Sequence, residues 1–161
     1  MSLLSGIIDE NVDRHTRDLV TLTATASITT ADHAGRTLLM GEVGGDAAAT
    51  FTLPAATGTG SVFKFVVSVV NTSNYLVKVA DATDTIDGQI MITDADGTAA
   101  TSFVTAAASD TITLNGTTTG GGAIGDYVEL IDIASNQYAV SGMVTCAAGS
   151  NIATMFSATV S

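Results

Sequence analysis

From Leu19 onward the chain consists of short apolar or alternating stretches separated by Gly, Asp, Asn and Thr. Alternation with period two and frequent turn residues are typical of short β-strands joined by tight turns. The pattern predicts an all-β fold, a β-sandwich or barrel of about ten short strands, as a single domain over residues 19–161. The predicted strands are 19–27, 37–40, 50–53, 61–70, 75–80, 89–93, 101–105, 110–114, 126–133, 137–143 and 155–160.

One segment departs from the strand pattern. In Thr30-Ala-Asp-His-Ala-Gly35, Thr30 can N-cap a single helical turn, and Gly35 can close it. No segment of helical length keeps an apolar stripe at i, i+3 and i+4. Helix is therefore expected only as this one turn.

The predicted strand at 61–70 is apolar on both faces. Such a strand is expected at the centre of a sheet or at a subunit interface. Lys64 interrupts it, and we expect its side chain either to extend to solvent or to pair with an acid of a neighbouring chain. Phe63, Lys64 and Phe65 are accordingly the candidates for a subunit interface.

Residues 1–18 differ in kind from the rest, because four aliphatic residues precede a charged stretch without strand alternation. This segment is predicted to be an extended N-terminal arm. Such an end can simply be frayed, or it can dock on a partner and become ordered there. The candidates for docking are Leu3, Leu4, Ile7 and Ile8.

Charge is distributed unevenly along the chain. The formal net charge is −11, all five basic residues lie at or before Lys78, and no Lys or Arg follows. Affinity for nucleic acid comes mainly from Lys and Arg contacts to phosphates, so we expect no nucleic-acid partner. The longest apolar run is too short to span a bilayer, so no membrane partner is expected either.

A formal Gly-x-Gly-x-x-Gly pattern occurs at Gly120, Gly122 and Gly125. A dinucleotide site needs a helix after these glycines, with its N-terminus directed at the pyrophosphate. Here residues 126–133 alternate with period two, which indicates a strand. The glycines are therefore interpreted as a flexible hairpin connection.

Asp84, Asp87, Asp94 and Asp96 lie close together in sequence and are candidates for a cation site. The EF-hand register fails, since aligning Gly97 with the loop glycine leaves apolar residues at the first and last ligand positions. Turn dipeptides at Asp87-Gly88 and Asp96-Gly97 explain the cluster more simply. A Ca²⁺ site of another type near Asp84 to Asp96 stays open, and no cofactor is expected.

No nucleophile and base form a recognisable catalytic set. His15 lies in the arm and His33 in the predicted turn, and no Gly-x-Ser-x-Gly elbow or Cys–His arrangement is present. Cys146 has no neighbouring cation in sequence and is expected to be a buried, inert thiol. We therefore expect that the chain is not an enzyme.

Three segments carry a family resemblance: ITTADHAGRTL (28–38), FTLPAATGTGSVFKF (51–65) and DTITLNGT (110–117). Together they resemble virion structural proteins of tailed bacteriophages, in particular small capsid decoration, or cement, proteins. The most recognisable piece is Thr52-Leu-Pro-Ala-Ala56. The resemblance leaves out the arm and residues 146–161.

The resemblance implies a virion protein that binds the outer capsid surface as a homotrimer, with the major capsid protein as its partner. Such a protein stabilises the shell. Similar T-L-P-A-A turns also occur in phage tail-fibre and head-fibre modules, so a module for host attachment is the alternative. A carbohydrate-active enzyme that uses an acid among Asp84, Asp87, Asp94 and Asp96 is a second alternative.

Overall fold

The computed structural model describes residues 19–149 and 151–160. It is nearly all β, with 46% of residues in strands and 3% in helix, and its twelve strands form two mixed sheets. The seven-stranded sheet has the order β1 (Leu19–Leu22), β3 (Thr37–Met40), β5 (Val62–Val67), β10 (Tyr127–Ala134), β11 (Gln137–Cys146), β7 (Thr85–Asp94) and β8 (Ala100–Val104). The five-stranded sheet has the order β12 (Phe156–Ser157), β9 (Thr111–Leu114), β6 (Tyr75–Lys78), β4 (Ala49–Thr52) and β2 (Ala26–Ser27).

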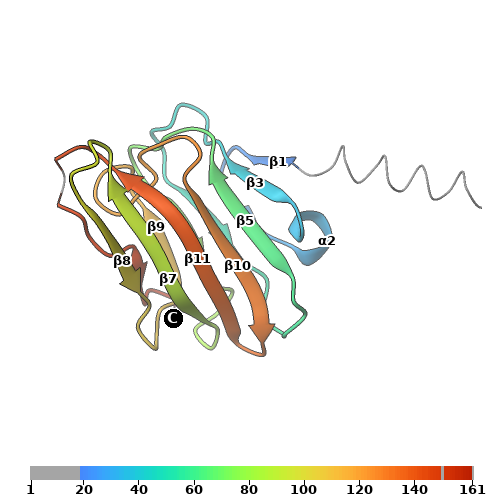
Figure 1. The fold of residues 1–161 in the computed structure, drawn as a ribbon. Helices are drawn as coiled ribbons and strands as arrows, with labels where there is room; N and C mark the ends of the chain where they lie inside the picture. The colour runs from blue at the N-terminus through green and yellow to red at the C-terminus, as the bar shows by residue number, and fades with distance from the viewer. Residues whose placement is uncertain (1–18, 150, 161) are drawn as a thin grey trace, which may run out of the picture.

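The predicted all-β sandwich is thus confirmed. Figure 1 shows the seven-stranded sheet face-on, running from β8 to β1. From β1 to β6 the chain changes sheet at every step, so β1, β3 and β5 are parallel neighbours in one sheet and β2, β4 and β6 in the other. This alternation splits the predicted strand 19–27 in two, because β1 and β2 belong to different sheets.

The predicted turn at Asp87-Gly88 is wrong, because both residues lie inside β7. Gly88 has φ 143°, and a Cβ atom there would lie 2.1 Å from the carbonyl oxygen of Val140 on β11. Glycine is needed for this close strand approach rather than for a turn. The other predicted turn is confirmed: Gly97 has φ 73° and donates its N–H to the carbonyl of Asp94 at 2.9 Å.

The single helical turn is confirmed as α2 (Thr30–His33), but its cap was misplaced by one residue. Thr29, not Thr30, is the N-cap, and its hydroxyl accepts the N–H of Asp32 at 3.2 Å. Gly35 follows with φ 73°. Among the described residues no helix is long and apolar enough to cross a membrane.

Aromatic side chains fill the space between the sheets. The Phe51 ring lies 5.8 Å from that of Phe65 and 5.9 Å from that of Tyr75, measured between centroids. Phe63 meets Tyr138 edge-on at 6.3 Å. All five side chains have at most 1% of their surface exposed, so the two sheets bury one continuous core.

Candidate functional site

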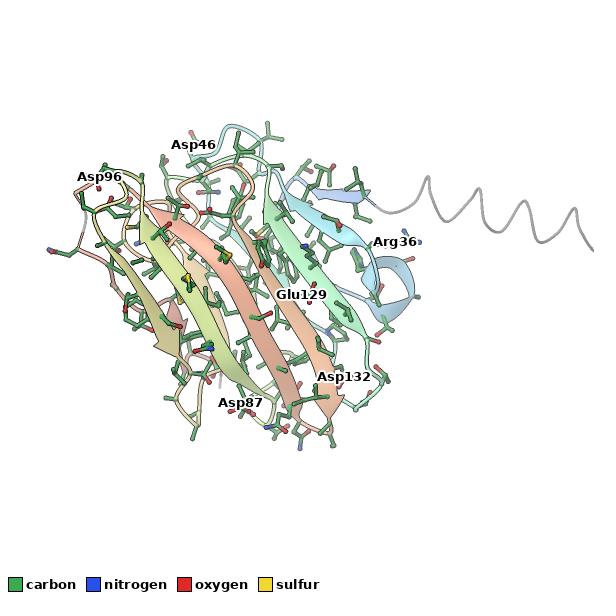
Figure 2. All side chains as sticks on the ribbon, viewed as in Figure 1. Arg36, Asp46, Asp87, Asp96, Glu129 and Asp132 are labelled. Carbon is green, nitrogen blue, oxygen red and sulfur yellow. The ribbon has the colours of Figure 1, made fainter. Side chains whose placement is uncertain are left out.

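The four carboxylates considered for Ca²⁺ do not converge. Asp84 precedes β7 and Asp94 ends it, so the ten-residue length of that strand separates them. Figure 2 shows Asp87 and Asp96 at opposite ends of the molecule. Within residues 19–149 and 151–160, no group of three or more His, Cys, Asp or Glu side chains could hold a metal ion.

Instead, several acids anchor loops, and Asp132 at the end of β10 is the clearest case. Its Oδ1 accepts the backbone N–H groups of Thr57 and Gly58 at 3.0 and 2.6 Å. Its Oδ2 accepts the backbone N–H and the hydroxyl of Thr59 at 3.0 and 2.7 Å. Burial alone would raise the pKa of Asp132, but these donors outweigh it and lower that pKa.

Asp126 organises the glycine-rich loop. The predicted flexible hairpin is wrong, because residues 115–126 cross from β9 in one sheet to β10 in the other. The Asp126 Oδ2 accepts the N–H groups of Gly121 and Thr145 at 3.0 and 2.7 Å, and Oδ1 accepts the Thr145 hydroxyl at 2.9 Å. Burial raises the pKa of this carboxyl, although the same hydrogen bonds oppose the shift.

Two further buried acids act in the same way. Glu42 accepts the N–H groups of Asp46 and Ala47 at 3.1 and 3.3 Å. Asp110 accepts those of Thr159 and Val160 at 2.8 and 3.1 Å. A buried carboxylate that already accepts backbone donors is committed to structure, so these four of the chain's sixteen acids have a structural explanation.

The other chemically notable residues also have structural roles. The Nδ1 atom of His33 accepts the backbone N–H of Thr29 at 3.0 Å, which closes the turn of α2. Cys146 has 0% of its surface exposed, and burial raises the pKa of its thiol, so the predicted burial of this residue is confirmed. His15 lies outside the described residues.

The three subunit-interface candidates separate onto the two faces of β5. Phe63 and Phe65 are 0% exposed within the single chain, so a second subunit cannot contact them and this part of the prediction is wrong. Lys64 points to the opposite, outer face. Its Nζ lies 4.8 Å from the centroid of the Tyr127 ring, and β10 places Glu129 opposite it in register.

Sequence analysis missed the apolar part of this outer face. Strand register aligns five side chains in one row across β3, β5, β10, β11 and β7, which we call the apolar row: Leu39, Val66, Tyr127, Met143 and Met91. Met91 and Met143 are 47% and 51% exposed. Both methionines occupy outward, odd-numbered positions on neighbouring strands. If the pairing of β7 with β11 had been known, this pattern could have revealed the row.

A shallow depression of about 250 Å³ lies beside the middle of the apolar row, lined in part by Tyr127 and Met143. Asp126 also lines it, but both oxygens of that carboxylate accept hydrogen bonds from the loop. The depression therefore offers mainly apolar contact.

The arm candidates Leu3, Leu4, Ile7 and Ile8 lie outside the described residues. The chain matches no protein-family model, and no curated protein or solved structure matches it.

Proposed function

We propose that this chain is a virion structural protein that binds the outer surface of a tailed-phage capsid as a homotrimer and stabilises the shell. The observation that carries the proposal is the segment 51–65, where the resemblance to decoration proteins is greatest. This segment holds the end of β4, a loop whose amides are held by Asp132, and the start of the interior strand β5. The resembling residues are thus an anchored crossover between the sheets.

The mechanism is mechanical. A subunit cluster that sits where several capsid proteins meet adds buried area across their junctions, and separating them must expose that area again. A ligand that binds only the assembled lattice favours the lattice by mass action. Loops held by internal carboxylates suit this role, because a rigid body loses little conformational freedom on binding. Leu3, Leu4, Ile7 and Ile8 are proposed to dock on the capsid protein.

The alternative, a fibre module for host attachment, receives less support. Receptor-binding modules commonly present aromatic side chains at loop tips. Here Tyr75, Tyr127 and Tyr138 all lie in strands, and Tyr75 and Tyr138 are at most 1% exposed.

Co-sedimentation with decoration-free capsids tests the proposal. The capsids are assembled from the major capsid protein encoded in the same genome, and full-length chain is compared with a truncation lacking residues 1–18. We expect saturable binding of the full chain and loss of binding by a truncation that keeps its fold and mass. A truncation that binds equally well would remove the arm from the proposal, and failure of both would favour the fibre module.

A further inference from the structure

We infer that the outer face of the seven-stranded sheet is where copies of this chain meet, with Lys64 of one copy beside Glu129 of another. This inference rests on the proposed homotrimer and specifies its interface. The face is the side of the sheet turned away from the five-stranded sheet, and the described part of the chain leaves it uncovered (Figure 1).

The apolar row supplies the hydrophobic component of the contact. It crosses five adjacent strands without a charged side chain, and its two methionines are about half exposed, at 47% and 51%. Scattered exposed apolar residues need no explanation, but a continuous row across a sheet marks an interaction surface. Methionine and tyrosine are also residue types that interfaces favour.

Charge identifies a second copy as the occupant. A net charge of −11 makes the chain repel itself over most approaches. The outward positions of the seven described strands carry only three charged side chains, Lys64 and Glu129 near the centre and Asp87 at one corner. Lys64 and Glu129 are direct neighbours in register, so the centre of the face is electrically neutral and complementary to itself.

The size of the face is adequate for this role. Seven strands about 4.8 Å apart, with about six residues each at about 3.3 Å, give roughly 700 Å². A partner in an interface of standard size buries about 800 Å². Around a threefold axis each copy divides this face between two neighbours, so each contact takes about half of it, about 350 Å² per partner.

The test is the mass of the full-length chain in solution, measured by light scattering, for a charge-swap series. Lys64→Glu and Glu129→Lys each place like charges at the interface and are expected to shift the mass toward that of the monomer. The double swap restores the pair and is expected to restore the oligomer. Lys78→Glu, on β6 of the other sheet, makes the same change of charge away from the face and is expected to leave the mass unchanged.

A variant with Met91→Ser and Met143→Ser tests the apolar row without altering charge, and we expect its dissociation constant to rise about tenfold or more. Thermal melting confirms that each variant is folded. A monomeric wild-type chain, or an oligomer indifferent to all these changes, would overturn the inference. Capsid binding by such a monomer would support the capsid-binding part of the proposed function and contradict its homotrimer. A wild-type dimer that Lys64→Glu dissociates would support the interface and contradict the trimer.

Discussion

Asp132 shows how one side chain can fix a loop that is distant in sequence. Its carboxylate holds the amides of residues 57–59, more than 70 positions away along the chain. These donors bind the ionised form, which is why they lower the pKa below the ordinary value of 3.8 despite burial. A carboxyl group whose folded pKa is lowered adds stability above its unfolded pKa and loses it as the pH falls through the folded pKa.

We therefore predict that Asp132→Asn lowers the free energy of unfolding at pH 7 by about 1–3 kcal/mol, because the ionised acceptor is lost. The difference from wild type should shrink as the pH falls below about 4, because the carboxyl group then binds a proton first in the unfolded chain and, at still lower pH, in the folded protein. Urea denaturation at several pH values measures both effects. Asp46→Asn removes the same charge from an exposed side chain and serves as the control.

At the same scale, the sequence did not reveal which acids are structural. Asp132 and Glu129 both fall within the predicted strand 126–133, yet Asp132 is buried with five hydrogen bonds and Glu129 lies on the outer face (Figure 2). The difference depends on the distant loop 57–59. Local sequence cannot report such partners. For this reason the sequence left a metal site open at the acids near Asp84, although other buried acids of the chain anchor loops.

At the scale of elements, β7 depends on a glycine that permits close approach of its neighbour. Gly88→Ala should destabilise the fold by at least about 2 kcal/mol, because the added Cβ overlaps the Val140 carbonyl and φ is unfavourable for an L-residue. Gly60 has φ 74° and no atom within 4 Å of an added Cβ, so Gly60→Ala should cost only about 1–2 kcal/mol from its backbone conformation. Equal losses in thermal denaturation would contradict this account.

The N-cap of α2 gives a second prediction at this scale. Thr29→Ala removes the hydroxyl that accepts the Asp32 N–H and should cost about 1 kcal/mol. Thr30→Ala, at the position that sequence analysis favoured, lies in the helix and should change stability by less than about half as much. Chemical denaturation of the two variants distinguishes the positions, and the reverse order would show that the cap is wrongly assigned.

Most strands could be predicted because alternation is a local property of the chain. The strands at 37–40 and 75–80 are matched by β3 and β6 within two residues. Sheet membership could not be predicted in the same way. Residues 115–126 are as rich in glycine as a hairpin loop, but the strands on either side of them belong to different sheets. β9 pairs with β6 and β12, whereas β10 pairs with β5 and β11.

At the scale of the whole molecule, the outer face depends on which side of each strand turns inward. The strand at 61–70 is apolar on both sides, but Lys64 shares the face of Val62 and Val66, so alternation already favoured the other face, with Phe63 and Phe65, as the core. The structure assigns the rings to the core and Lys64 to the outer face. Of the three subunit-interface candidates, only Lys64 lies on the accessible side of the strand.

The central claim is that the chain reinforces an assembled shell, and the most direct measurement is the temperature at which decoration-free capsids disassemble as purified full-length chain is added. The account predicts that this temperature rises and then saturates at a fixed number of bound copies, a multiple of three per equivalent capsid site. A folded chain that binds the capsids without raising the temperature, or does not bind them at all, would contradict it.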